Sequence, residues 1–491
     1  MNLSKNHLDN ITAKGITKPS DAIFGLPEKV LQFGTGVLLR GLPDYFIDKA
    51  NRQGLFNGRV VVVKSTDGGD VAAFDRQDSL YTLCVRGIDE GKKVEENIIC
   101  SAISRVLSAR TQWQAILQLA HNPEMQIIVS NTTEVGIQLV EEDINSAPPG
   151  SFPGKLLAFL HQRWKAFNGS PESGMIIIPT ELLVDNGNKL KNIVQQLAEF
   201  NKLGSGFGSW LNQHCRFCNS LVDRIVPGKP DPTTLQKLEH DLGYKDDLLS
   251  IAEVYRLWAI EGDEKIRQTL SFAAADPGVI IAEDIEIYRE LKLRLLNATH
   301  TLSCGLGFLM GFDTVKTAMD NPPFATFVAD LMLKEIAPAI PYEIPYEEAR
   351  DFGLKVIDRF RNPHLQHQWL SITMQYTSKI KSRVIPVLLR HYGQHDFPPP
   401  HIALGFAAYL LFMRAQPPHP VNDDKAGYYS DLWQKYPAPE VATLTLHDRS
   451  LWGANLTQLH GFEGAVRLFL DDLMAKGPVA TLAQLTTKAT L

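Results

Sequence analysis

A lysine, an asparagine and a histidine lie close together in the segment 291–300 (LKLRLLNATH), as Lys292, Asn297 and His300. At about 100° per residue in an α-helix they point to about 0°, 140° and 80°, so one broad helix face can carry all three. A lysine that can give up its proton suits general acid catalysis in carbonyl reduction, and an amide and an imidazole can donate hydrogen bonds to the developing oxyanion. A single helical lysine is more often a solvated surface charge, so the predicted catalytic role depends on the three residues together.

A second pattern predicts dinucleotide binding. A candidate strand, 29–33 (KVLQF), leads into Gly34-Thr35-Gly36 and then into a helical segment. Glycines in such a turn let the backbone approach a pyrophosphate, which the positive end of the helix attracts. The third glycine of the usual fingerprint is replaced by Leu39, and Gly-x-Gly also occurs in plain turns, so the pattern alone is weak. The residues expected to contact the cofactor here are Phe33, Gly34, Thr35, Gly36, Val37, Leu38 and Arg40.

The end of the next candidate strand bears on the identity of this cofactor. The run 59–64 (RVVVVK) is followed by Asp67, at a spacing where an acid often accepts the ribose hydroxyls, which favours NAD. Lys64 pulls the other way, because a lysine there can attract the 2′-phosphate of NADP. A solvated loop after a strand is the alternative for both residues.

A third strand-end loop follows the run 125–130 (MQIIVS) and contains Asn131, Thr132 and Glu134. Ligands of open α/β sheets lie beyond the carboxyl ends of the strands, so these side chains would face the cofactor. Capping of a helix by Thr or Asn is an equally common use of such residues, and it remains the alternative.

The chain as a whole predicts an α/β domain followed by a mostly α-helical domain. Up to about residue 290, short β-branched runs alternate with helical patterns, which is typical of a parallel sheet covered on both faces. The runs are 29–33, 59–64, 125–130 and 175–179, and the later helical patterns are 288–308, 323–336, 346–360, 364–392, 401–414 and 461–476. We expect the domains at 1–285, with an N-terminal arm at 1–28, and at 286–491.

Composition excludes several classes of protein. The 49 Lys and Arg residues against 55 Asp and Glu give a net charge of −6, which does not favour nucleic-acid binding. Five cysteines in 491 residues are too few and odd in number for a disulfide framework, and they fit a reducing compartment. The N-terminus lacks an apolar signal region, and the apolar stretch 402–413 is short of the ~20 residues that span a bilayer. We expect a cytoplasmic protein without a membrane partner.

Metal binding is not predicted. Cys215 and Cys218 form one Cys-x-x-Cys pair, but no second pair follows at zinc-ribbon spacing, so buried thiols are the better interpretation. The adjacent pair Asp223-Arg224 follows an apolar run and is interpreted either as a buried ion pair or as a substrate contact, with a structural role favoured.

Taken together, these segments resemble the mannitol dehydrogenase family of long-chain, zinc-independent polyol dehydrogenases, over nearly the whole chain. The resemblance implies an extended Rossmann domain followed by an all-helical domain, NAD as the cofactor, and a monomer or weak oligomer. It also implies that Lys292 is the catalytic lysine, that Asn297 and His300 bind the oxyanion, and that Asp223 reaches the active site. The segments that carry it are LQFGTGVLLRG (31–41), QDSLYT (77–82), NPEMQIIVSNTTEVGI (122–137), IIIPTELLVDNG (176–187), SLVDRIVPG (220–228), LKLRLLNATH (291–300) and RFRNPHLQHQ (359–368).

Two positions depart from the polyol dehydrogenases. Thr180-Glu181-Leu182 stands where they have Cys-Asp-Asn, so Leu182 cannot repeat the contact of that asparagine with substrate hydroxyls. Arg289 stands where some relatives carry a glutamate that assists proton passage. The first departure argues against a plain mannitol dehydrogenase and favours the branch that acts on sugar acids.

The expected reaction is therefore NAD-dependent reduction of a hexuronate-derived keto acid, D-tagaturonate to D-altronate. The substrate carboxylate needs cationic partners, for which Arg361, Lys379 and Arg383 are candidates, although each could equally be a surface charge. Fructuronate reduction and mannitol oxidation are alternatives within the family, and a non-catalytic dinucleotide-binding protein is an alternative from another class.

Overall fold

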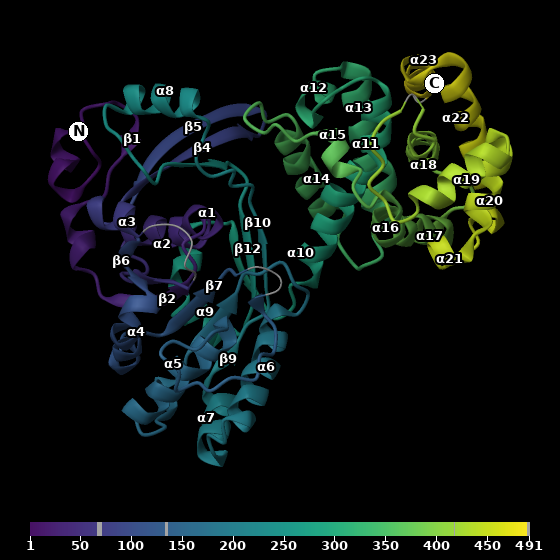
Figure 1. Cartoon of the computed structure of the whole chain (residues 1–491). Coiled ribbons are helices and arrows are strands. Elements are labelled where there is room, and N and C mark those ends of the chain that lie inside the picture. The colour runs from purple at the N-terminus through teal and green to yellow at the C-terminus, as the bar shows by residue number, and fades with distance from the viewer. Residues whose placement is uncertain (66–70, 133–135, 417, 489–491) are drawn as a thin grey trace. The chain divides into compact units, whose positions relative to one another are not determined.

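The computed structural model describes the chain except residues 66–70, 133–135, 417 and 489–491 (Figure 1). Its backbone divides into two compact units. The sheet unit comprises residues 1–86 and 93–285, and the helical unit comprises residues 87–92 and 286–491. The predicted cofactor contacts Asp67 and Glu134 lie outside the described residues.

A parallel sheet forms the centre of the sheet unit (Figure 1). Its strands are β2 (Glu28–Phe33), β3 (Arg59–Lys64), β6 (Ile103–Ser108), β7 (Ile127–Ser130), β8 (Ile176–Pro179) and β9 (Arg216–Phe217). They are ordered β6-β3-β2-β7-β8-β9 and every described pair is parallel. The chain runs outward on one side from β2 to β3 and β6, then returns to start the other side at β7. This reversal puts a topological switch point between the carboxyl ends of β2 and β7, where open α/β sheets bind ligands.

Both faces of this sheet are buried, which explains the continuous apolar runs in the sequence. Val60 and Val62 of β3 pack into one hydrophobic core, whereas Val61 and Val63 pack into a second core on the opposite face. Because side chains alternate between faces, a strand covered on both sides needs apolar residues at every position. The helices of this unit are α1 (Val37–Gly41), α2 (Pro43–Arg52), α3 (Ala72–Arg76), α4 (Ala109–Gln118), α5 (Phe152–Ala166), α6 (Asn186–Phe200), α7 (Ser205–His214), α8 (Pro232–Leu242) and α9 (Glu264–Thr269).

Two further sheets in this unit are not predicted from the sequence. One has the order β1-β5-β4-β11 and the other β10-β12-β13. Their strands are β1 (Ile16–Thr17), β4 (Tyr81–Asp89), β5 (Lys92–Cys100), β10 (Ser220–Asp223), β11 (Ser250–Glu253), β12 (Leu257–Glu261) and β13 (Val279–Ala282). The first half of β5 (KKVEE) is mostly exposed and charged, so it carries none of the apolar continuity by which buried strands are recognised.

The N-terminal arm belongs to the fold of the sheet unit. Leu3, Leu8 and Ile11 are buried in a hydrophobic cluster with Tyr244 and Leu249. Residues Ile16–Thr17 then add to the sheet edge beside β5. The arm therefore extends the core of this unit beyond the central sheet.

The helical unit contains α-helices interrupted by π-helical segments (Figure 1). Its longer α-helices are α11 (Thr299–Leu309), α13 (Pro322–Asp330), α14 (Tyr346–Phe360), α17 (Ile385–Gln394), α18 (Pro400–Met413), α19 (Ala426–Lys435), α20 (Ala438–His447), α22 (Phe462–Lys476) and α23 (Pro478–Lys488). The shorter ones are α10 (Glu286–Leu291), α12 (Val315–Met319), α15 (Trp369–Ile372), α16 (Tyr376–Lys379) and α21 (Arg449–Trp452). The predicted fold class, a Rossmann-type parallel sheet and then a mostly helical domain, is confirmed.

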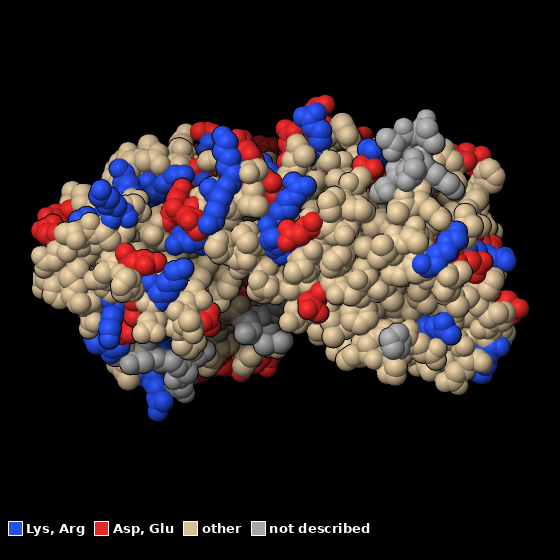
Figure 2. All heavy atoms as spheres, turned by 90° about the horizontal axis from the view of Figure 1, so that it is seen from above, with Lys and Arg blue, Asp and Glu red and all other residues tan. Residues whose placement is uncertain are grey.

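The apolar stretch 402–413 lies inside the helical unit, as most of α18. Every residue from His401 to Met413 is buried, because α11 and α22 pack along the helix. A helix covered on all sides has no polar face, which accounts for its unbroken apolar sequence. Among the described residues, no helix is long and apolar enough to cross a membrane. On the face shown in Figure 2, acidic and basic side chains are interspersed.

The predicted continuous helix 364–392 is wrong, because the structure breaks it into several pieces. α15 ends at Ile372, and the turn that follows contains Gln375 with a φ of 52°. α16 then leads into the π-helix η10 (Ile380–Val384), and α17 follows. Two other π-helices, η7 (Lys292–Ala298) and η8 (Leu331–Ile336), interrupt patterns that predict plain α-helix. The apolar periodicity locates these helices but does not show the change in hydrogen-bond register.

Candidate active site

The glycine turn lies at the switch point of the central sheet. Gly34 follows β2 with a φ of 129°, and its N–H donates to the Val63 carbonyl at 3.0 Å. A Cβ at Gly34 would lie 3.0 Å from Leu39 Cδ1 and 3.1 Å from the Asn131 carbonyl oxygen, so the position requires glycine. Gly36, just before α1, has an ordinary φ of −63°, and a Cβ there would meet nothing within 4 Å. The first glycine serves the fold, and the second leaves open surface beside the turn.

The other predicted cofactor contacts around the glycine turn have side chains in different environments. The Phe33 ring is buried against Phe152, and Leu38 packs on the hydrophobic core. Arg40 turns inward, where its guanidinium donates to the Leu248 carbonyl and lies 5.4 Å from the Tyr81 ring centroid. Burial lowers its pKa. The Arg40 side chain thus packs inside the sheet unit, and its contact with the cofactor stays a prediction.

Thr35 and Val37 lie at the surface side of the turn and are half-buried. Leu39, at the position of the missing third glycine, is fully buried. The usual third glycine allows close packing of the helix against the strand. Here the chain leaves the helix after Gly41 instead, since Leu42 has φ −135° and ψ −79° and Pro43 begins α2. A short first helix therefore accommodates the bulkier leucine.

The loop after β7 is tied to the loop after β8 by side-chain hydrogen bonds. Asn131 Nδ2 donates to the Thr180 carbonyl and hydroxyl at 3.1 and 3.0 Å. The N–H and hydroxyl of Thr132 donate to Glu181 Oε1 at 2.8 and 3.0 Å, and Ser130 Oγ donates to Oε2 at 3.2 Å. Burial raises the pKa of Glu181, and these hydrogen bonds offset only part of that increase. Asn131 and Thr132 thus shape this edge of the sheet, and Glu181 is a residue that the sequence analysis did not single out for this.

Asp223 ends β10 in a buried position, and Arg224 follows it. The Arg224 guanidinium donates to the Glu253 and Gly41 carbonyls at 2.9 and 2.6 Å and lies 4.6 Å from the Tyr45 ring centroid. Burial lowers its pKa to about 10. Arg224 therefore has the structural role that the sequence favoured, since it holds the end of α1 against β11.

In the helical unit, Lys292 and Asn297 lie on the π-helix η7, and His300 follows in α11. Because π-helical hydrogen bonds join residues five apart, Lys292 and Asn297 lie nearly above one another on neighbouring turns. The separation of about 140° expected for an α-helix is therefore wrong, and the π register brings the two side chains closer together. Both are half-buried, and the Thr301 hydroxyl donates to the Asn297 carbonyl at 2.8 Å.

His300 is enclosed by aromatic rings and positive charges. Its ring stacks on Phe360 at a centroid distance of 4.0 Å and meets the edges of His367 and Trp369 at 5.2 and 6.1 Å. Its buried Nε2 has no hydrogen-bond partner among the described residues. Burial and the nearby charges of His367, Arg359, Arg383 and Lys379 hold the pKa of His300 well below its usual value. A neutral imidazole with an unused nitrogen can bind a substrate oxygen but cannot supply a proton as an acid.

Two of the three predicted cations lie in this environment. Lys379 Nζ donates to the Ile372 carbonyl at 2.9 Å, and Arg383 donates to the Thr301 hydroxyl at 3.2 Å. Burial lowers the pKa of each, and their mutual repulsion lowers that of Lys379 further. Both charges contribute to the low pKa of His300.

Arg361 is exposed at the end of α14. Arg359, which the sequence analysis missed, is buried, and its charge helps to lower the pKa of His300. Residues two positions apart on an α-helix point about 200° apart, so the two arginines face opposite sides of the helix. The burial of Val356 and Phe360 identifies the inner side of α14. Apolar periodicity in the sequence could therefore have selected Arg359 over Arg361.

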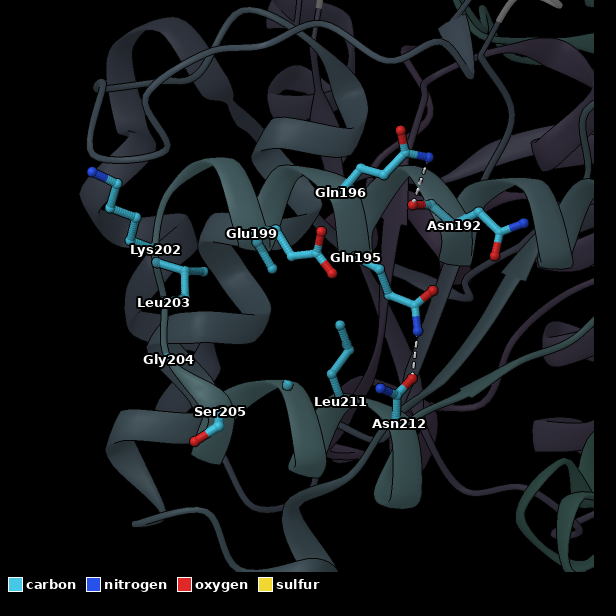
Figure 3. A pocket seen from close by; sticks show the side chains of 12 residues that line it. Asn192, Gln195, Gln196, Glu199, Lys202, Leu203, Gly204, Ser205, Leu211 and Asn212 are labelled. Atoms are coloured by element: carbon cyan, nitrogen blue, oxygen red, sulfur yellow. Dashed lines mark hydrogen bonds between the residues drawn. The ribbon is translucent and has the colours of Figure 1, made fainter.

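A surface pocket of about 650 Å³ between α6 and α7 does not coincide with these residues (Figure 3). Amide side chains dominate its wall, and Gln195 Nε2 donates to Asn212 Oδ1 at 2.5 Å. Glu199 and Lys202 are the ionisable residues that line it. None of the predicted site residues does so.

No group of three or more His, Cys, Asp or Glu side chains in the described parts of the chain could hold a metal ion. Cys215 and Cys218 are buried free thiols, and burial raises the pKa of each to about 12. A buried thiol with so high a pKa stays protonated and is unreactive.

A glycine turn at the switch point of a parallel sheet, followed by a helical unit with lysine, asparagine and histidine, defines a two-domain dehydrogenase. Residues 28–272 match the profile of the mannitol dehydrogenase Rossmann domain, and residues 284–473 match that of the mannitol dehydrogenase C-terminal domain. The chain belongs to the mannitol dehydrogenase family and is an oxidoreductase that acts on CH–OH groups.

Similar proteins span almost the same length. Altronate oxidoreductase of Bacillus subtilis (strain 168) is 37% identical over 463 residues, covering 93% of this chain and 95% of that protein. Altronate oxidoreductase of Escherichia coli O6:K15:H31 is 35% identical over 463 residues, covering 92% and 95%. Among solved structures, Pseudomonas fluorescens mannitol 2-dehydrogenase in a ternary complex with NAD and D-mannitol has a TM-score of 0.67 at 22% identity, covering 99% and 100%. A substrate-free D-sorbitol dehydrogenase has a TM-score of 0.77 at 22% identity, covering 98% and 100%.

The two glycines of the turn should respond differently to substitution. Gly34→Ala introduces a Cβ at a φ of 129° and against a backbone oxygen, and it should lower the free energy of unfolding by about 1–3 kcal/mol. Gly36→Ala should leave stability nearly unchanged, because its Cβ meets open space. Denaturant unfolding of the two variants measures this difference. Equal losses would show that the turn does not have the described conformation.

The buried His300 should make stability depend on pH. Its pKa is below 6.5 when folded, so the unfolded chain binds more protons and the free energy of unfolding falls as pH drops below about 6.5. Above that pH the stability is fully present. His300→Asn removes this titration, so it should lose less stability than the wild type between about pH 7 and pH 5. Thermal unfolding across this range tests the difference, and parallel pH profiles would count against a neutral His300.

Proposed function

We propose that this protein is an NAD-dependent reductase of a sugar-derived keto acid, converting D-tagaturonate to D-altronate. The observation that carries the proposal is the set of positive charges around His300, to which Arg359, Lys379 and Arg383 contribute. Lys379 and Arg383 are half-buried and donate to neutral oxygen atoms, and a neutral ketose would bring no opposite charge to them. A substrate carboxylate would offset them. The similarity to altronate oxidoreductases supports the same substrate class.

The glycine turn fits a dinucleotide. The open space over Gly36 and the strand order both leave room at the carboxyl ends of β2 and β7 for a pyrophosphate. The backbone of Phe33 to Leu38 would hold it, with Asn131 and Thr132 shaping the adjoining loop. NADH supplies a hydride to the carbonyl carbon when bound. NAD is preferred to NADP because Asp67 follows β3 and because the mannitol 2-dehydrogenase named above was solved with NAD.

The chain's own residues carry the rest of the reaction. Asn297 and the unpartnered Nε2 of His300 donate hydrogen bonds to the carbonyl oxygen as negative charge grows on it. His300 remains neutral throughout, so the proton must come from another group. Lys292, one π-helical turn from Asn297, gives its proton to that oxygen and removes it in the reverse direction.

The substrate carboxylate is bound by Lys379 and Arg383, with Arg359 adding positive charge from α14. The hydrogen bonds of Lys379 to Ile372 and of Arg383 to Thr301 fix both cations before substrate arrives, which reduces the entropy lost on binding. D-Fructuronate presents the same functional groups and is the second candidate. All five cysteines are free and buried, which supports a reducing compartment, and we propose the cytoplasm.

Replacing Lys292 should separate binding from chemistry. Lys292→Ala should bind NADH with unchanged affinity, measured by fluorescence titration, because Lys292 lies outside the sheet unit that holds the dinucleotide. Its kcat with D-tagaturonate should fall by about 10²–10⁴-fold, the usual contribution of a general acid to the rate. Turnover within a few-fold of wild type would remove Lys292 from the mechanism.

Removing the cations should weaken binding of acidic substrates selectively. The double variant Lys379→Met/Arg383→Met should raise KM for D-tagaturonate by at least about tenfold, since each charge-assisted hydrogen bond contributes roughly 1.5–3 kcal/mol. Lys381→Met is the matched control, because Lys381 is an exposed cation on the same π-helix. Steady-state assays with D-tagaturonate, D-fructuronate and D-fructose complete the test. A wild-type preference for D-fructose would contradict a sugar-acid substrate.

A further inference from the structure

A buried arginine joins the two π-helices of the candidate site. Arg294 of η7 donates through Nε and Nη2 to the Glu290 carboxylate at 2.8 and 3.2 Å. Its Nη1 donates to the carbonyls of Ser382 and Arg383, in η10, at 2.7 and 2.9 Å. Arg294 is 6% exposed and Glu290 is 9% exposed, so this contact is closed to solvent. One side chain thus fixes the distance between the helix with Lys292 and the helix with Arg383.

The sequence explains why η10 needs a donor from outside. Pro386 lies two residues after the end of η10 and has no N–H. In an α-helix that N–H would bind the carbonyl four residues earlier, which is Ser382. Arg294 supplies the missing donor to Ser382 and binds the next carbonyl as well. The proline therefore removes one backbone donor beside these carbonyls, and Arg294 supplies two donors from outside the helix.

The continuous helical segment formed by α16 and η10 carries the cations of the proposed carboxylate site. Arg383 contributes its carbonyl to Arg294 and its guanidinium to the Thr301 hydroxyl, which in turn donates to the Asn297 carbonyl. Lys379 lies one turn earlier. A shift of η10 relative to η7 would move both cations relative to Asn297 and His300.

We infer that Arg294, held by Glu290, is a positioning residue that sets where Lys379 and Arg383 present their charge to the substrate carboxylate. The inference rests on the proposed function. It also gives the buried Arg294–Glu290 ion pair a role other than stability, since such a pair often contributes little net stability compared with apolar residues of similar volume. An arginine is required because its planar fork reaches three acceptors in fixed directions, which a lysine cannot do.

The test is Arg294→Lys, which keeps the charge opposite Glu290 but cannot bind both the carboxylate and the two carbonyls. KM for D-tagaturonate should rise about tenfold, while kcat changes by less than about threefold. NADH affinity should be unchanged. Glu290→Gln, which keeps the side-chain size and an acceptor for the guanidinium, should raise KM in the same direction by a smaller factor.

A control separates positioning from stability. Arg163 is a buried arginine of the sheet unit whose guanidinium binds the carbonyls of Ser173, Ala120 and Asn122, before the starts of β7 and β8. Arg163→Lys should lower the melting temperature without changing KM for D-tagaturonate. If it raises KM as much as Arg294→Lys does, the effect is one of general stability and the inference fails.

Combining variants tests whether Arg294 acts through the cations. In the Lys379→Met/Arg383→Met background, Arg294→Lys should raise KM by less than about twofold, because the groups it positions are gone. Multiplicative effects, or an unchanged KM in Arg294→Lys alone while the double variant raises it, overturn the inference and leave the proposed function standing. If the double variant itself leaves KM unchanged, the proposed carboxylate site fails, and the positioning role fails with it.

Discussion

The helical unit places an uncharged imidazole among positive charges, and this electrostatic arrangement constrains the site around it. His300 is buried against Phe360 and feels His367, Arg359, Arg383 and Lys379, so its protonated form is strongly disfavoured. The cations themselves are partly desolvated, and hydrogen bonds from Lys379 and Arg383 to protein oxygens offset only part of that cost. Lys379 and Arg383 therefore lie half-buried beside a neutral imidazole, where an anionic group could approach them favourably.

The π-helices determine how these groups face one another. A π register is less favourable than the α register and occurs mostly as short segments at functional sites. In η7 it brings Lys292 and Asn297 onto neighbouring turns, and in η10 it lies between Lys379 and the proline-containing start of α17. Arg294 binds backbone oxygens of η10 from η7, so each distorted segment stabilises the other.

The sequence predicted the parts of the fold that depend on simple periodicity. β3, β7 and β8 are buried and appear as mostly apolar runs, and β2 is recognised with the help of the glycine turn that follows it. Lys292, Asn297 and His300 lie on one continuous helical segment because their spacing is local. The sequence did not reveal the π register, because apolar residues at similar spacing suit either helix. It also did not mark the charged half of β5 as a strand, and it favoured Arg361 over Arg359, because charge alone does not distinguish the inner arginine of α14 from the outer one.

In the proposed function, substrate preference depends on the helical unit more than on the sheet. In the segment that resembles Cys-Asp-Asn of the polyol dehydrogenases, Glu181 is buried and accepts hydrogen bonds from Ser130 and Thr132, and the neighbouring Leu182 is 63% exposed and apolar. Neither can bind substrate hydroxyls as an exposed asparagine would. A carboxylate placed against two ordered cations would be a charge-based criterion that a neutral polyol cannot meet. In the proposed function, specificity for a sugar acid therefore comes from Lys379 and Arg383 rather than from a polar contact at Leu182.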